Sequence, residues 1–153
     1  PRQERTDLYQ LISELVSHFR DAAERKQVSL SMECPSSLVA TSDPYFLREI
    51  IHALLENAVR YTPSGGTVAL RAAASEDGGI AIEITDTGYG IPAHQQKNIF
   101  HKFFRGDNVV TKVTEGCGIG LYLVSLMVVL LHAKISCVSV EGEGSTFRVD
   151  LPA

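Results

Sequence analysis

The sequence predicts an α+β fold, a two-layer α/β sandwich in which a mostly antiparallel sheet carries helices on one face. Two observations lead to this prediction. First, apolar residues recur at helical spacing in two segments, and a third segment is apolar almost throughout. Second, apolar and polar residues alternate in several short segments, which are separated by turn sequences. The order of these segments fits one sheet with helices packed against a single face. The length of 153 residues fits a single domain that covers residues 1–153.

The N-terminal half contains two helices and two strands. Asp7 can cap a first helix that runs to Arg25, where apolar residues recur every three or four positions. Residues 28–33 alternate as a strand, and a short strand follows at residues 38–40. Ser42 or Asp43 followed by Pro44 is a strong helix start, so we expect a second helix that ends near Tyr61.

The C-terminal half adds strands on both sides of a glycine-rich stretch. Residues 67–74 and 80–85 read as a hairpin, because Glu-Asp-Gly-Gly lies between them. Residues 86–92 are glycine-rich, and a short helix is expected over residues 93–100.

A long loop separates this short helix from the last elements. Residues 106–118 have no periodicity, and loops of that length inside a compact domain are usually functional. A buried helix over residues 120–132 and a strand pair at residues 135–140 and 146–151 complete the chain.

Composition excludes several classes of function. The formal net charge is −4 and no run of Lys or Arg stands out, which argues against a nucleic-acid partner but leaves a small anionic ligand open. The three cysteines form no CxxC pair, which favours a reducing compartment, and no histidine spacing indicates a metal cage built by the protein. The longest apolar stretch, residues 119–131, is shorter than the roughly 20 residues of a membrane span. We expect a cytoplasmic domain without direct membrane contact, whether or not its parent protein is membrane-anchored.

Four short motifs follow one another in a fixed order, and together they carry the chemistry. They are LLENAVRYTP at residues 54–63, DTGYGIP at 86–92, IFHKFFR at 99–105 and GCGIGL at 116–121. An aspartate at a strand end, Asp86, can accept a hydrogen bond from an exocyclic amine. Gly88 and Gly90 let the backbone approach a flat base.

The other motifs supply groups that suit phosphates. Glycines before a helix, at 116, 118 and 120, leave N–H groups free to bind phosphate. Asn57 supplies a neutral oxygen that suits Mg²⁺, and Arg60 and Arg105 can answer phosphate charge. Each signal alone is weak, and the ordered set is far more specific.

These motifs in this order resemble the N box, first glycine box, F box and second glycine box of the catalytic ATP-binding domain of sensor histidine kinases. That domain belongs to the superfamily that includes DNA gyrase and a class of heat-shock chaperone ATPases. The resemblance covers nearly the whole chain. It implies a Bergerat-type fold with about three helices and a flexible ATP lid at about residues 106–118.

The resemblance also implies a set of residues that bind ATP and Mg²⁺. The set is Asn57, Arg60, Tyr61, Asp86, Gly88, Gly90, Ile91, Phe103, Phe104, Gly116, Gly118, Ile119, Gly120, Leu121 and Thr146. Within it, Asn57 corresponds to the metal ligand, and Asn57, Arg60 and Arg105 to the catalytic residues. Thr146 sits where the family often places a hydroxyl beside the adenine pocket.

One departure affects the expected activity. The family's helix usually carries a further asparagine four residues before the one matched by Asn57, and its ATP-hydrolysing members tend to have a glutamate there. This chain has Ala53, which argues against gyrase-type hydrolysis and predicts weaker Mg²⁺ or phosphate coordination. Besides an active kinase, three alternatives stay open: a weakened pseudokinase, a nucleotide-sensing interaction module, and a serine kinase of the anti-sigma-factor type.

The expected partner is a second domain. The resemblance implies transfer of the γ-phosphate to a histidine on a separate dimerisation domain of the same parent protein, and a response regulator downstream. The typical phosphoacceptor motif, His-Glu-x-x-[Thr/Asn]-Pro, is absent, and His18 reads as a surface or edge residue. We therefore expect the domain alone to be monomeric and to transfer little phosphate.

The last helix carries an apolar stripe at Tyr122, Leu126 and Val129, where relatives tend to place charged residues at the last two positions. Deeper burial within this domain is the favoured interpretation, because a helix apolar on every side is normally buried. A docking stripe for another domain is the alternative.

Overall fold

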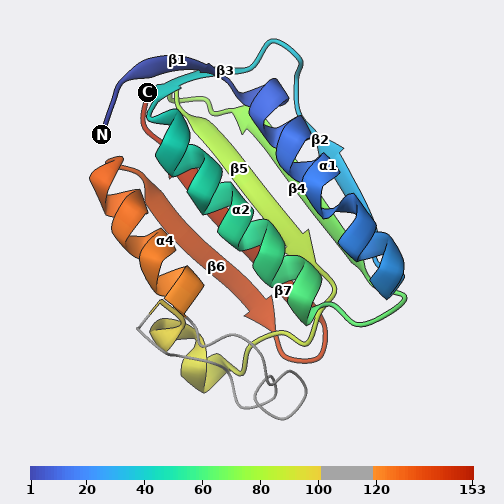
Figure 1. Ribbon diagram of the computed structural model, residues 1–153. Helices are drawn as coiled ribbons and strands as arrows, with labels where there is room; N and C mark the ends of the chain where they lie inside the picture. Colours follow the sequence, from blue (N-terminus) through green and yellow to red (C-terminus); the bar gives the residue numbers. More distant parts are fainter. Residues whose placement is uncertain (101–118) are drawn as a thin grey trace.

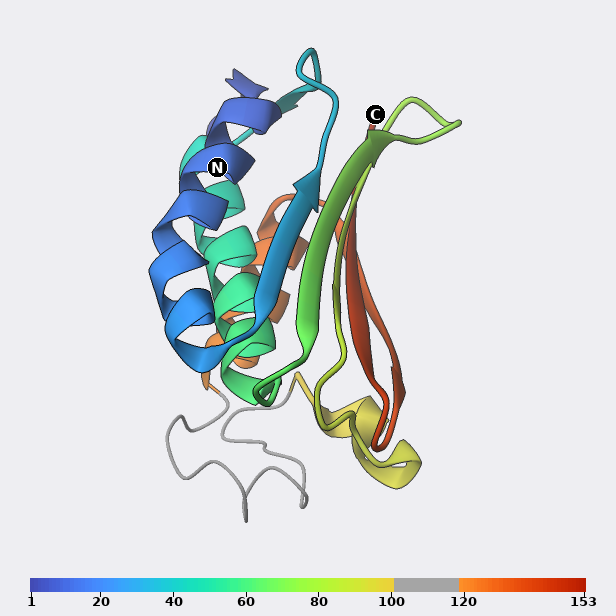
Figure 2. The same ribbon diagram turned by 90° about the vertical axis from the view of Figure 1, so that its right-hand side faces the viewer.

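The computed structural model describes residues 1–100 and 119–153, and in this part three helices lie on one face of a five-stranded sheet (Figures 1 and 2). In spatial order the strands are β2 (Ser29–Glu33), β4 (Thr67–Ala74), β5 (Ile80–Asp86), β7 (Gly144–Leu151) and β6 (Lys134–Val140). The β2–β4 pair is parallel and the other three pairs are antiparallel. The predicted α+β sandwich with a mostly antiparallel sheet is confirmed.

The helices are α1 (Leu8–Lys26), α2 (Pro44–Tyr61) and α4 (Ile119–Leu130), with a short 3₁₀ helix, η1 (Ala93–Asn98), in the segment expected to be a short helix. Both α1 and α2 begin where the sequence places their caps. The Asp7 carboxylate accepts a hydrogen bond from the Gln10 N–H at 3.0 Å and caps α1. Asp43 caps α2 in the same way, and Pro44 occupies the first helical position. None of the described helices is both long and apolar enough to cross a bilayer.

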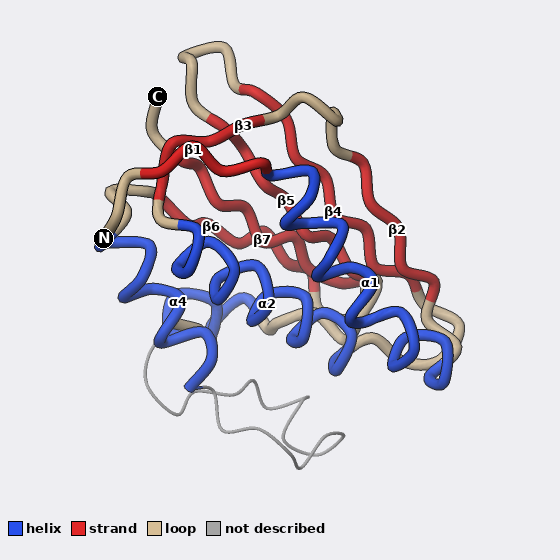
Figure 3. Tube along the Cα trace, turned by 45° about the horizontal axis from the view of Figure 1, so that its top comes forward, coloured by secondary structure: helices blue, strands red, loops and turns tan. Residues whose placement is uncertain are grey.

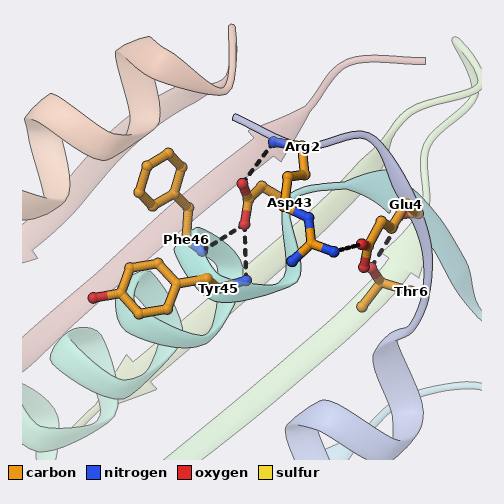
Figure 4. Close-up of polar contacts among 6 residues, drawn as sticks. All are labelled: Arg2, Glu4, Thr6, Asp43, Tyr45 and Phe46. Carbon is orange, nitrogen blue, oxygen red and sulfur yellow. Dashed lines mark hydrogen bonds and ion pairs between the residues drawn. The ribbon is translucent and has the colours of Figure 1, made fainter.

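Strands β1 (Glu4–Asp7) and β3 (Val39–Ser42) form a two-stranded antiparallel sheet (Figure 3). The sequence predicts a strand near β3 but none at β1. The β1 sequence, ERTD, has no apolar alternation, so nothing local marks it as a strand. Its position is fixed by pairing with β3 and, just before the strand, by the Arg2 N–H, which donates a hydrogen bond to the Asp43 carboxylate at 2.7 Å (Figure 4). The β1 segment therefore lies against the start of α2.

The core fills the space between the helices and the inner face of the sheet. Leu54 and Leu55 of α2 are almost completely buried, and burial of each such side chain contributes about 1.5–3 kcal/mol. In β5, Ile80, Ile82 and Ile84 are buried at every second position. The same alternation turns Asp86, the last residue of β5, toward the helix layer.

The expectation that α4 is buried on every side is wrong for the described residues. Its inner face packs into the core through Val124 and Val128. Its outer face stays exposed, with Leu126 at 45% and Val129 at 70% of full exposure. The reason is position: α4 lies at one edge of the helix layer, with α2 on its inner side, and beside edge strand β6, so no further described element covers it (Figure 1). The docking alternative for this stripe stays open.

Candidate functional site

Most of the described site residues gather at one end of the sandwich, the lower end in Figures 1 and 2. The C-terminal turns of α2, the end of β5 and the turn between β6 and β7 all reach this end. The start of α4 lies at the same end (Figure 1). Elements that are far apart in the sequence thus converge around the loop that follows β5.

Asp86 is a buried carboxylate at the centre of this end. Its side chain is only 7% exposed, and β-sheet register places it opposite Ser145 of β7. Burial raises the pKa of Asp86, and hydrogen bonds from the backbone N–H groups of Gly88 and Ser145 offset part of that increase. The Gly88 bond to Asp86 Oδ1 measures 2.8 Å. Because each carboxylate oxygen has two lone pairs, these two bonds leave Asp86 with unused acceptor capacity.

Backbone elements approach the Asp86 loop so closely that side chains are excluded. A Cβ on Gly88 would lie 2.5 Å from the Tyr61 carbonyl oxygen at the end of α2. Gly90 has a φ of +69°, and a Cβ there would collide with the Val140 carbonyl oxygen at the end of β6. The two glycines therefore let the loop lie directly between α2 and the β6–β7 turn.

The hydroxyl beside Asp86 belongs to Ser145 and not to Thr146. Alternation in β7 puts Ser145 on the same inner face as the buried Phe147. Thr146 points to the opposite face, where its Oγ1 lies 3.0 Å from Thr85 Oγ1. The predicted position of the hydroxyl, Thr146, is therefore wrong by one residue. Ser145 could have been identified from strand alternation, because it lies two positions before the apolar Phe147 and so shares its face.

The thiol of Cys137 in β6 interacts electrostatically with the Asp86 carboxylate. Burial, with a smaller contribution from Asp86, raises the pKa of this thiol to about 12. The raised pKa keeps this thiol in its neutral form at physiological pH.

The α2 residues of the site lie on the flank of the helix that faces α4. Ala53, Asn57 and Arg60 are spaced three or four positions apart and all are partly exposed, so they form one row. The guanidinium of Arg60 lies 3.8 Å from the exposed Glu56 carboxylate, a surface pair that contributes little stability. Arg60 can therefore exchange this partner for a phosphate at small cost.

The end of α2 is anchored by a lysine from α1. Lys26 Nζ donates hydrogen bonds to the carbonyl oxygens of Val59, at 2.9 Å, and of Arg60. Burial, followed by the nearby Arg60 charge, lowers the pKa of Lys26. These bonds satisfy carbonyls that the helix end would leave unpaired, and they fix the turn that carries Asn57 and Tyr61.

The remaining predicted site residues fall in two groups. Gly120 is exposed at the first turn of α4, and Leu121 is partly buried beside it. Ile119 begins α4. Phe103, Phe104, Arg105, Gly116, Gly118 and the expected lid at 106–118 lie outside the described residues.

A magnesium ion fits this site only through a mixed set of ligands. Among residues 1–100 and 119–153, no cluster of three or more His, Cys, Asp or Glu residues could hold a metal ion. The side-chain amide of Asn57 offers one oxygen. Mg²⁺ usually keeps several waters and binds substrate phosphates, so one protein oxygen is compatible with it.

A separate groove of about 420 Å³ lies between α1 and α2, away from this end. Glu14, Leu15, His18, Arg48, Glu49 and His52 line it. His18 is exposed, as expected for a surface residue, and its ring centroid lies 5.6 Å from that of His52. An ion pair of 2.8 Å between Arg48 and Glu14 spans the groove, so these two charged side chains are already paired with each other.

The chain is similar to known histidine kinases over its whole length. A family model described as "Histidine kinase-, DNA gyrase B-, and HSP90-like ATPase" matches residues 42–153. The sensor histidine kinase TmoS of Ectopseudomonas mendocina is 35% identical over 97% of this chain and 15% of its own length. The circadian input-output histidine kinase CikA of Thermosynechococcus vestitus is 38% identical over 94% of this chain and 20% of its own length. The chain thus spans a fifth or less of these two relatives.

Solved structures share the fold at lower sequence identity. The nucleotide-free catalytic domain of histidine kinase ThkA superposes with a TM-score of 0.85 at 21% identity, covering 99% of this chain and 96% of that one. Full-length ShkA in complex with AMPPNP superposes with a TM-score of 0.83 at 24% identity, covering 98% of this chain and 31% of that one. At these identities the likeness concerns the fold alone.

Proposed function

The chain belongs to the family of histidine kinase-, DNA gyrase B- and HSP90-like ATPases, and from this premise we propose that it is the catalytic domain of a two-component sensor kinase. In this proposal it binds ATP with Mg²⁺ and offers the γ-phosphate to a histidine on a separate dimerisation domain. The observation that carries the proposal is the buried Asp86 carboxylate, which keeps unused acceptor capacity beside a loop whose glycines exclude side chains.

The Asp86 carboxylate indicates where the purine base of the nucleotide would bind. A buried acceptor with spare lone pairs is costly unless a donor reaches it, and the exocyclic amine of adenine is such a donor. Gly88 and Gly90 let the loop pack directly against the carbonyl groups of Tyr61 and Val140, and in this proposal that packing holds Asp86 and its loop in position for a flat base. The complex of the structural neighbour ShkA with AMPPNP supports an adenine nucleotide as the ligand.

The phosphate end uses the α4-facing flank of α2. Asn57 would contribute an oxygen to Mg²⁺, and the ion would neutralise phosphate charge when bound. Arg60 would turn from Glu56 toward the phosphates. Phosphoryl transfer needs chiefly positioning and charge stabilisation, so these residues hold the nucleotide while the acceptor domain supplies the nucleophile.

One observation favours a second candidate function, a pseudokinase that binds nucleotide without transfer. Ala53 occupies the row of Asn57 one helical turn earlier and has no oxygen to give. The row thus supplies a single amide for metal binding. No comparable observation favours the serine-kinase alternative.

Calorimetry with a non-hydrolysable ATP analogue, with and without Mg²⁺, tests the proposal. Tight binding that requires Mg²⁺ supports the kinase, and binding that ignores Mg²⁺ supports the pseudokinase. Absence of binding in both conditions contradicts both. Phosphotransfer from the domain and radiolabelled ATP to the dimerisation domain of its own parent protein then tests the enzyme directly.

A further inference from the structure

Both backbone polar groups of Ile91 are held by side chains. The Ile91 N–H donates a hydrogen bond to Ser139 Oγ at 2.8 Å, and its carbonyl oxygen accepts one from Gln96 Nε2 at 2.9 Å. Ser139 comes from β6 and Gln96 from η1. Backbone groups that are withdrawn from water need such partners, so these two side chains take the place of a neighbouring strand. They fix the end of the Asp86 loop.

Gln96 also joins the Asp86 loop to β6. Its Nε2 donates a second hydrogen bond, of 2.8 Å, to the Ser139 carbonyl oxygen. One amide group therefore holds the carbonyls of Ile91 and Ser139 at a fixed separation. The loop, β6 and η1 cannot move apart without breaking these bonds.

The Ser139 hydroxyl has three polar neighbours and one proton. It accepts from the Ile91 N–H, and its Oγ lies 3.0 Å from the Gly144 carbonyl oxygen and 2.8 Å from Ser145 Oγ. A carbonyl only accepts, so the Ser139 proton must point to Gly144 if all three bonds form. Ser145 must then donate its own proton to Ser139.

This proton direction determines what Ser145 presents beside Asp86. With its proton used by Ser139, the Ser145 hydroxyl presents only lone pairs to its other neighbours. Ser145 lies opposite Asp86 in the register and shares its inner face. The carboxylate and the hydroxyl oxygen are then both acceptors, which matches an amino group and repels a carbonyl oxygen.

We propose that Ser139 is a positioning residue that sets purine specificity, because it fixes the proton direction of Ser145, while Gln96 holds Ser139 against Ile91. This inference rests on the proposed nucleotide function. It assigns the preference for a 6-amino over a 6-oxo purine to a residue of β6 that need not touch the base.

The test compares binding of ATP and of inosine triphosphate, which differ at the 6-position and N1 of the purine, in the presence of Mg²⁺. For the Ser139→Ala variant we expect the ratio of the two affinities to fall about 5- to 10-fold, because the freed Ser145 proton can meet the inosine carbonyl. Ser136→Ala is the matched control, since Ser136 is an exposed serine on the outer face of the same strand. It should leave the ratio unchanged.

Ser139→Thr and Ser139→Val form a second pair, equal in shape and different by one hydroxyl. The threonine variant should keep the parent's ratio of ATP to inosine triphosphate affinity, and in the valine variant this ratio should fall. This pair tests the inference even if the alanine variant fails to fold. An unchanged ratio in both the alanine and valine variants, or an equal loss for both nucleotides, overturns the inference. If the parent chain binds neither nucleotide, the proposed function itself has failed, and the two failures are thereby distinguished.

Discussion

Asp43 and Asp86 are both buried aspartates that accept backbone hydrogen bonds, yet their pKa values shift in opposite directions. At Asp43, Oδ1 accepts from the N–H groups of Tyr45, at 2.9 Å, and Phe46, at 3.3 Å, while Oδ2 accepts from Arg2 (Figure 4). These bonds, the Arg2 bond first, lower the pKa of Asp43. At Asp86, burial outweighs two hydrogen bonds and raises the pKa.

We interpret the difference as one between a structural carboxylate and a carboxylate that binds the ligand in the proposed function. Asp43 uses both oxygens to join the segment before β1 to the first turn of α2, so its charge is stabilised within the chain. Asp86 has fewer donors than its burial requires, which costs free energy until a ligand adds another. Carboxylates whose pKa is raised by burial are common at functional sites. The substitutions below are chosen to break or sharpen this comparison.

The largest effect is expected where a side chain is forced into the Asp86 loop. Gly90→Ala adds a Cβ against the Val140 carbonyl oxygen at a φ of +69°, so the free energy of unfolding should fall by about 3 kcal/mol. Nucleotide binding should be lost with the displaced loop. Chemical denaturation and calorimetry measure the two effects.

Gly142→Ala is the control for this substitution, because Gly142 has a φ of +84° but nothing within 4 Å of an added Cβ. It should cost only the conformational term of about 1 kcal/mol. Equal losses in the two variants would show that the loop is not closely held.

Removing the cap at Asp43 should lower stability and leave binding intact. Asp43→Ala deletes the acceptor for three backbone N–H groups at the start of α2, so the Tm should fall by roughly 2–4 °C. Because Asn57 and Arg60 lie at the other end of the helix, the Kd for nucleotide should stay within about twofold. A large loss of affinity would mean that Asp43 is not purely structural.

Lowering the pH should affect the two aspartates in sequence. The raised pKa of Asp86 means that it protonates first, above the ordinary value of 3.8, and there the acceptor that we propose for the adenine amine is weakened. The same protonation relieves a penalty on the folded state, so the contribution of Asp86 to stability rises as pH falls.

Asp43 behaves oppositely. Its stabilising contribution is present above 3.8 and is lost only as pH falls through its lowered folded pKa. Carboxyl ¹³C NMR titration, with each resonance assigned by an Asp→Asn variant, measures both groups. Observing Asp43 titrate at a higher pH than Asp86 would contradict the comparison.

A substitution far from both aspartates provides a reference for the changes in stability and nucleotide affinity. Leu126→Lys lies on the exposed outer face of α4, so the free energy of unfolding should change by no more than about 0.5 kcal/mol and nucleotide affinity should not change. Val128→Lys, on the buried face of the same helix, should unfold the domain. Thermal denaturation of both variants tests the assignment of the two faces.

The elements with strong local signals could be predicted from the sequence. Asp43 before Pro44 marks the start of α2, and apolar spacing marks its buried face, so both its position and orientation follow. The outer face of α4 could not be predicted, because a helix that is apolar on every side carries no periodic signal of which side is covered. Strand β1 was missed because its pairing with β3 is not encoded in its own four residues.

The residues of the site likewise divide into those that the sequence predicts and those that only the fold brings together. Asp86 follows from a motif, but its burial and spare acceptor capacity depend on β7 and the loop. Thr146 was assigned from resemblance, whereas strand alternation assigns the pocket hydroxyl to Ser145. Gln96 and Ser139 have no sequence signal, because their roles arise from contacts between residues 43 positions apart.

Calorimetric titration of the Asp86→Asn variant with AMPPNP and Mg²⁺ tests most directly whether the buried carboxylate recognises the nucleotide. We expect affinity at least about 10-fold below that of the parent chain, because a hydrogen bond to a charged acceptor is lost. The Tm should not fall, since the neutral amide no longer carries the burial penalty of the carboxylate. A variant that binds the nucleotide as tightly as the parent would contradict this account of the site.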